Sequence, residues 1–176
     1  MDPTKSAPWT AARRPAISIA SPDNYSGAES LTAGRALADA LGRFGSHGVR
    51  LATHWGSLTG FLSEAYRLYR EPDEANERFG DFSLSVEHPI PGLAVYAARA
   101  RQGDRLQIVV INKTADTIDT ELSFRSARKF RLADLLGFDA EHRHTMSLDI
   151  RLSDGDDALV VNLPPWSARR YAFAGL

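Results

Sequence analysis

The sequence has no cysteine and almost no net charge, and both absences narrow what the protein can be. Without cysteine there is no disulfide, no thiolate nucleophile and no cysteine-ligated zinc. The net charge is −1 at pH 7, so charge gives no reason to expect attraction to nucleic acid or to an anionic membrane. No stretch is long and apolar enough to span a bilayer. We therefore expect neither nucleic acid nor a membrane as a partner.

Residues 1–14 lack the continuous apolar run of a signal peptide. They are instead rich in Pro, Ser, Thr and Ala, which is typical of a loose tail, and they leave the localisation unknown. The chain has 176 residues, which suffices for one or two domains of about 150 residues. It is too short for a complete (β/α) barrel, which needs roughly 250 residues.

The segment from residue 15 to residue 78 alternates between strand-like and helical patterns. Ser26 and Glu29 match a capping box, which would place the start of a helix directly after Ser26. Apolar side chains at helical spacing then indicate two helices, each preceded by a β-prone run. The expected order is strand, helix, strand, helix, over residues 15–20, 31–44, 49–55 and 59–70.

From about residue 79 the spacing of apolar residues changes to period two, which is typical of strands. Arg105–Ile111 is nearly continuously apolar at its centre, as expected for a strand covered on both faces. Turn signals separate further short strands, around residues 93–97, 117–124, 130–132, 159–163 and 171–173. This spacing favours an antiparallel β-sandwich. The predicted fold is α+β, with a loose tail, a strand–helix segment and a β-sandwich domain over residues 1–14, 15–78 and 79–176.

Five segments together resemble glycoside hydrolase family 44, a family of endoglucanases and xyloglucanases. They are Thr53–Gly56, Tyr66–Arg70, Phe79–Asp81, Val109–Thr114 and Leu163–Ser167. The resemblance implies the last units of a (β/α) barrel followed by a β-sandwich, which is the C-terminal third of such an enzyme. On that basis residues 15–78 are a partial (β/α) unit derived from the barrel.

The resemblance also bears on catalysis. A retaining glycosidase needs two carboxyl groups about 5 Å apart, one as nucleophile and one as acid/base. The resemblance places Ile19 where the family has its nucleophilic glutamate, and the acid/base glutamate belongs to an earlier strand without a counterpart here. Asp23 and Glu29 are the remaining carboxyl pair near the expected barrel mouth, and they are the catalytic candidates. The alternative interpretation is a turn residue and a helix cap.

Trp55 is the leading candidate for substrate binding. The resemblance places it at the end of the last barrel strand, where an indole can stack on a sugar ring and donate a hydrogen bond. His54 beside it is a candidate for a hydrogen bond to a sugar hydroxyl. Packing at the junction of barrel and sandwich is the alternative for Trp55, and it is our interpretation of Trp166.

Other polar clusters predict structure rather than chemistry. His142 and His144 lack a third metal ligand and indicate a solvated loop. Asp154–Asp157 indicates a hairpin turn, Asn112 a turn-forming side chain rather than a glycosylation acceptor, and Arg169–Arg170 a solvated surface. We expect no metal ion and no cofactor.

Two functions remain open. The first is a glycosidase-derived, carbohydrate-associated protein that binds β-glucan-type oligo- or polysaccharides without the catalysis of the family. The alternative is a small glycoside hydrolase with a reassembled carboxylate pair, for which a homodimer offers one way of bringing the two groups together. A third interpretation is a truncated product without activity. Because two barrel strands without neighbours expose their edges, we also expect the chain to form a homo-oligomer.

Overall fold

The structure is a computed structural model that describes residues 16–20, 27–49, 51–70, 79–101, 105–123, 129–143, 145–146 and 158–175. Its elements in chain order are β1 (Ala16–Ala20), α1 (Leu31–Ser46), β2 (Leu51–Trp55), α2 (Gly60–Arg67), β3 (Phe82–Leu84), β4 (Leu93–Arg99), β5 (Arg105–Asn112), β6 (Ile118–Ser123), β7 (Phe130–Phe138), β8 (Thr145–Met146), β9 (Ala158–Leu163) and β10 (Ala168–Gly175). Among the described residues, no helix is long and apolar enough to cross a membrane.

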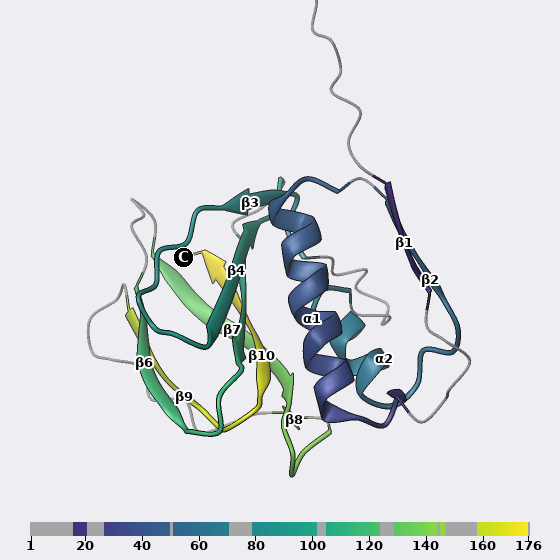
Figure 1. Cartoon of the computed structure of the whole chain (residues 1–176). Coiled ribbons are helices and arrows are strands. Elements are labelled where there is room, and N and C mark those ends of the chain that lie inside the picture. The colour runs from purple at the N-terminus through teal and green to yellow at the C-terminus, as the bar shows by residue number, and fades with distance from the viewer. Residues whose placement is uncertain are drawn as a thin grey trace, which may run out of the picture.

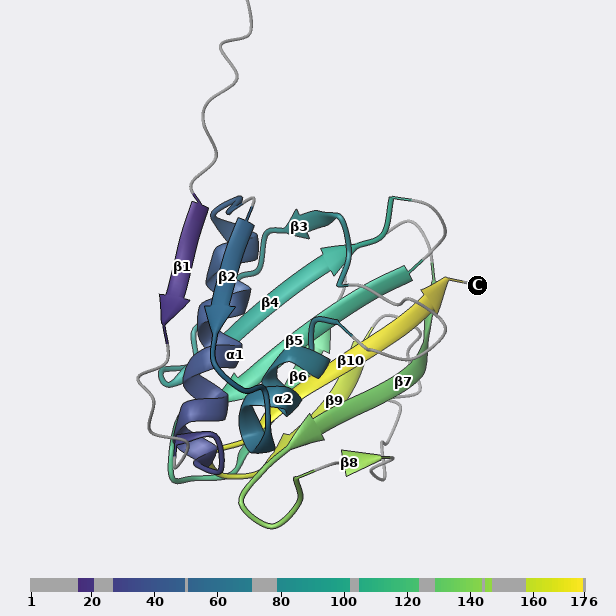
Figure 2. The same ribbon diagram turned by 90° about the vertical axis from the view of Figure 1, so that its right-hand side faces the viewer.

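The central layer is a six-stranded antiparallel sheet in the order β3-β4-β5-β10-β7-β8. The antiparallel pair β6-β9 covers one face of this sheet, and α1 and α2 cover the other (Figure 1). The pair β1-β2 is parallel and lies on the far side of the helices from the sheet (Figures 1 and 2). The predicted antiparallel, β-rich second half is confirmed.

β5 shows why the sheet is covered on both faces. Its even-numbered apolar residues, such as Ile108 and Val110, join the core under β6-β9, whereas Val109 and Ile111 pack with the helices. Successive strand residues point to opposite faces, so a continuous apolar run is what such a position requires. The predicted two-sided burial of this strand is confirmed, because residues 106–112 are all buried.

The helices are held against the sheet by their apolar stripes. Leu37 and Ala38 of α1 are buried together with Ala65 of α2 and with Leu68, which follows that helix. These side chains share one core with residues of β4, β5, β7 and β10, among them Phe138, whose ring lies 5.7 Å from that of Phe61. The helical face and the sheet therefore bury each other.

The predicted capping box is wrong. α1 begins at Leu31, its N-cap residue is Ser30, and no side chain caps it. Instead, the Ser30 backbone N–H donates to the Gly27 carbonyl at 3.0 Å, so a turn precedes the helix. Glu29 lies in that turn. The short strands β3 and β8 were not predicted, because three and two residues are too few to show an alternating pattern.

The first four elements follow the predicted order, and β1 and β2 pair from Ala16↔Leu51 to Ala20↔Trp55. The origin of these elements in a (β/α) barrel, and the domain boundaries at residues 14 and 78, stay predictions.

Gly42 of α1 packs so closely on Tyr96 of β4 that a Cβ there would lie 2.2 Å from the Tyr96 Cδ2 atom. We expect Gly42→Ala to lower the free energy of unfolding by about 1–3 kcal/mol, the usual cost of overpacking. Gly45 is the matched control, because a Cβ built there has no neighbour within 4 Å. Gly45→Ala should leave stability unchanged or raise it by up to about 1 kcal/mol through helix propensity. Urea denaturation measures both, and equal responses would contradict the close packing.

Candidate functional site

Trp55 stands at the exposed end of β2. Its side chain is 72% exposed, and Leu51 at the start of the same strand is 57% exposed. Residues two apart on a strand share a face, so both lie on the face that also carries Thr53. Leu58, in the loop that follows, is 46% exposed. This exposed face of β2, defined by Leu51, Thr53 and Trp55, is therefore open to solvent and carries two large apolar side chains.

His54 lies on the opposite side of the strand from Trp55. Its ring makes an edge-to-face contact with Tyr66 of α2, with centroids 5.8 Å apart and an interplanar angle of 88°. Both ring nitrogens are buried, and neither has a hydrogen-bond partner among the described residues. The structure therefore does not bring the two predicted binding residues to the same face. The role of His54 stays a prediction, and only Trp55 is open to a ligand as placed.

Of the two residues in the predicted carboxyl pair, the structure describes only Glu29. Asp23 lies outside the described residues. Glu29 forms an ion pair with the Arg143 guanidinium, and both side chains are about half exposed. The same guanidinium lies over the Phe61 ring at 5.3 Å. Glu29 thus joins the turn before α1 to the loop after β7, and a catalytic role for it stays a prediction.

Arg169–Arg170 is not a solvated surface, and that prediction is wrong. The two residues are 1% and 0% exposed. β10 lies between β5 and β7 and is covered on both faces there, so alternate side chains meet protein on either side. Arg170 Nη2 donates to Asp134 Oδ2 at 2.8 Å, and Arg169 Nη2 donates to Asp139 Oδ2 at 3.1 Å. Burial lowers the pKa of the Arg169 guanidinium.

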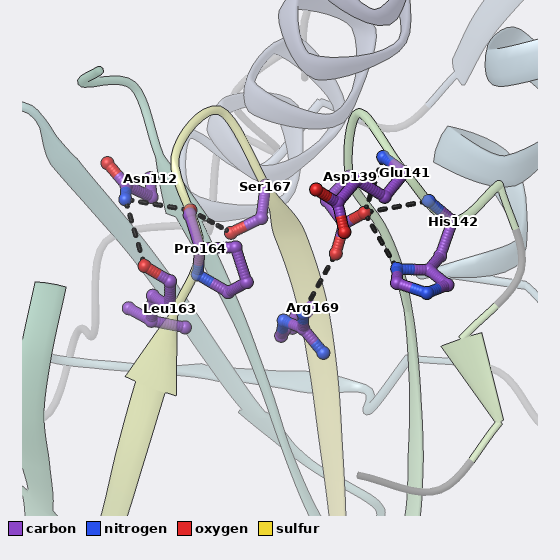
Figure 3. Close-up of polar contacts among 8 residues, drawn as sticks. All are labelled: Asn112, Asp139, Glu141, His142, Leu163, Pro164, Ser167 and Arg169. Carbon is purple, nitrogen blue, oxygen red and sulfur yellow. Dashed lines mark hydrogen bonds and ion pairs between the residues drawn. The ribbon is translucent and has the colours of Figure 1, made fainter. Parts of the chain in front are cut away.

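Asp139 organises the loop after β7 (Figure 3). Its Oδ1 accepts hydrogen bonds from the backbone N–H groups of Glu141 and His142 at 2.9 and 2.8 Å, and lies 3.2 Å from His142 Nδ1. Its Oδ2 accepts from Arg169. This buried carboxylate therefore fixes the loop that carries Arg143. The sequence analysis did not single out Asp139, because a lone aspartate after a strand gives no signal of burial.

Asn112 is a buried, turn-forming residue, as predicted. Its Nδ2 donates to the carbonyls of Asp116, Leu163 and Pro164 at 2.8, 3.2 and 2.9 Å, and its Oδ1 accepts from Thr114 (Figure 3). The side chain ties the end of β5 to the turn between β9 and β10. A fully buried amide is not available as a glycosylation acceptor.

Trp166 lies in that turn with φ of 55° and donates its backbone N–H to Thr114. The Arg35 guanidinium of α1 lies 4.5 Å from the centre of its ring. A cation over an indole face is a favourable contact. Trp166 is nevertheless 38% exposed, so this contact covers only part of the ring, and the junction packing predicted for the residue stays a prediction.

Within the described residues, no group of three or more metal-binding side chains could hold an ion. His142 is engaged with Asp139, whereas His144 and Asp154–Asp157 lie outside the described residues.

The fold matches known glycosidase structures over most of the chain. A β-mannanase/endoglucanase A from Caldicellulosiruptor saccharolyticus is 32% identical over 120 residues, which are 66% of this chain and 9% of that protein. The structure of a family 44 endoglucanase from Clostridium thermocellum aligns with a TM-score of 0.75 and 28% identity, over 89% of this chain and 31% of the other. No family model matches the sequence.

A Paenibacillus polymyxa xyloglucanase of family 44, solved with xyloglucan, gives a TM-score of 0.75 and 27% identity over 89% of this chain and 32% of its own. The chain is glycoside hydrolase family 44-like. The resemblance carried by the five short segments is thus confirmed. The chain spans less than a third of each of these three relatives.

The family 44-like segments have different roles here. Val109–Thr114 and Leu163–Ser167 form the end of β5 and the turn before β10, which Asn112 holds together. They serve packing. Thr53–Gly56 forms the end of β2 and reaches the surface with Trp55. Of the two tryptophans in the family-like segments, Trp55 is the more exposed, at 72% against 38% for Trp166.

We expect Asp139→Ala to lower the free energy of unfolding by about 3–5 kcal/mol, because it leaves the buried Arg169 guanidinium unpaired. Glu29→Gln is the matched change at an exposed pair and should cost no more than about 1 kcal/mol. Chemical denaturation followed by circular dichroism measures both. A loss below 1 kcal/mol for Asp139→Ala would show that the buried pair is not needed.

Proposed function

We propose that the protein binds β-glucan-type saccharides at the exposed face of β2, with Trp55 as the stacking platform. The observation that carries the proposal is the 72% exposure of this indole at the end of β2. Contiguous exposed apolar surface marks interaction sites on soluble proteins, and an exposed indole offers such surface to a sugar ring. The family supports the ligand class, since its endoglucanases and xyloglucanases include one solved with xyloglucan.

The proposal also holds that the double displacement of the family does not occur. Ile19 and Ala20 stand in register with His54 and Trp55, and neither residue has a carboxyl group. Glu29 is engaged by Arg143. We further propose that β1, α1, β2 and α2 derive from the last units of a (β/α) barrel. The parallel pairing of β1 with β2 supports this origin.

Titration with cello- and xyloglucan oligosaccharides should perturb the tryptophan fluorescence of the native protein and leave that of Trp55→Ala unchanged. One stacked ring contributes about 1 kcal/mol beyond area burial, so the dissociation constant should lie near the millimolar range. Trp166→Phe is the control and should keep the response, because the Arg35 guanidinium already lies over the ring of Trp166.

An assay for reducing ends on the same saccharides should show no turnover. Turnover that disappears in Asp23→Asn would replace the binding proposal with the small-hydrolase alternative. A fluorescence response that persists in Trp55→Ala would place the binding site elsewhere.

We also propose that two copies associate through the exposed face of β2. Parallel sheets are almost always covered on both faces, whereas β2 exposes Leu51 and Trp55. A closed two-fold dimer is the commonest arrangement of identical chains. Because Trp55 lies on this face, saturating saccharide should lower the dimer fraction.

Sedimentation should therefore show a dimer that Leu51→Lys shifts to the monomer by at least about tenfold in dissociation constant, as expected for loss of 1.4 kcal/mol or more. Val160→Lys is the control, since Val160 of β9 is 46% exposed on a different layer. A native protein that stays monomeric at high concentration would contradict the proposal.

A further inference from the structure

β3 is an exposed edge strand of the six-stranded sheet. It pairs with β4 on one side, and no other strand of the described residues pairs with its outer side (Figure 2). Its three residues are all exposed, with Phe82 at 40% and Leu84 at 37%. The outward backbone N–H and C=O groups of an edge strand are a template for pairing with another chain. The outer side of β3 is therefore open to an added strand.

Two arginines extend over this edge. Arg99 of β4 lies directly opposite Phe82, and its guanidinium carbon is 5.3 Å from the centre of the Phe82 ring. Arg101 follows the end of β4, and its guanidinium carbon is 5.2 Å from the same ring centre. Both arginines are exposed, and neither forms an ion pair with a carboxylate of the described residues. The contacts with the ring hold two like charges together but do not neutralise them.

Backbone contacts fix the position of this group. A Cβ atom at Gly80 would lie 2.4 Å from the Arg99 carbonyl carbon, so the segment before β3 lies tightly against the end of β4. Asp81 Oδ2 accepts a hydrogen bond from the Arg101 backbone N–H at 2.9 Å. These contacts place Phe82 opposite Arg99 without the help of a ligand. The ring and both cations are thus in position before a partner binds.

The neighbouring strands add charge of the same sign at this end of the sheet. β5 begins at Arg105, beside the end of β4, and Arg105 and Arg131 of β7 both pair with Ala174 of β10. A second copy of the chain would bring the same cations to the shared edge. Like charges that face each other across strands are destabilising, so pairing of two β3 strands is opposed. A strand with acidic side chains is complementary.

We propose that the outer edge of β3 binds an extended acidic peptide segment of a partner protein, which adds as a further strand of the sheet. A carboxylate opposite Phe82 on the added strand lies on the same face as the two guanidinium groups and accepts charge-assisted hydrogen bonds from them. Main-chain hydrogen bonds supply affinity, and the arginines select for acidic sequences. This edge shares no residue with the exposed face of β2, so the proposal does not depend on saccharide binding.

The test is a titration of the ¹⁵N-labelled full chain with a short peptide that alternates glutamate with threonine. We expect saturable amide shifts at Phe82, Ser83 and Leu84. Hydrogen exchange of the outward β3 amides should slow, because an added strand accepts their hydrogen bonds. A peptide with glutamine in place of glutamate should bind at least about tenfold more weakly, because it cannot form charge-assisted bonds. Absence of shifts in β3, or equal binding of the glutamine peptide, would overturn the proposal.

The matched variants separate this edge from the general charge of the sheet. Arg99→Gln/Arg101→Gln should weaken binding of the acidic peptide at least about tenfold. Arg131→Gln removes one exposed cation four strands away from β3, a separation of about 19 Å. Because screening acts over about 8 Å at physiological salt, this variant should bind as the native protein does. Undiminished binding in the double variant, or an equal loss in Arg131→Gln, would contradict the assignment to Arg99 and Arg101.

A methylated peptide distinguishes strand addition from attraction between charges alone. Methylation of every backbone nitrogen keeps the carboxylates but removes the donors that a neighbouring strand requires. This peptide should neither bind nor slow exchange in β3, and undiminished binding would overturn strand addition. Equal binding of an oligogalacturonate or of a single-stranded oligonucleotide would show a surface for polyanions in general and overturn the assignment to a peptide. The tryptophan response to saccharides should be the same in Arg99→Gln/Arg101→Gln and in the native protein.

Discussion

β5 and β10 lie side by side at the centre of the six-stranded sheet, and protein covers both of their faces. The rest of the architecture depends on this burial. On one side it requires β6-β9, and on the other it requires the two helices. β5 meets the requirement with apolar residues on both faces. β10 carries two arginines, and these are accommodated because Asp134 and Asp139 lie within hydrogen-bonding distance.

The contrast between these two strands shows what the sequence can predict. The apolar run of β5 is a local signal, and it correctly indicated a strand covered on both faces. Arg169–Arg170 is also local, but the partners that make its burial tolerable lie 36 and 30 residues earlier in the chain. No spacing rule connects an arginine with an aspartate over such separations. The two arginines were therefore predicted to lie on the surface, and this was wrong because their tertiary contacts with Asp134 and Asp139 allow burial.

The candidate site follows the same division. The end of a strand at Trp55 was predictable, and so was the separation of His54 from it, because neighbouring strand residues point to opposite faces. The contact of Glu29 with Arg143 was not predictable, because the two residues lie 114 positions apart in the sequence. Arg143 belongs to a loop that Asp139 holds in place. The hydrogen bond from the Tyr96 hydroxyl to Asp39 also joins residues 57 positions apart. Local patterns placed the elements, and long-range polar contacts placed the side chains.

The position of β10 has a consequence for how the protein is made. Residues 168–175 are the last described strand, yet they lie between β5 and β7 and hydrogen-bond to both. During synthesis, β3, β4 and β5 leave the ribosome before their central neighbour exists, so β5 and β7 each present an unpaired edge for that time. The sheet can close only after residues 168–175 have emerged. Until then the unpaired edges of β5 and β7 can form hydrogen bonds with strands of other molecules. A chaperone that binds extended apolar segments would have its largest effect in that interval.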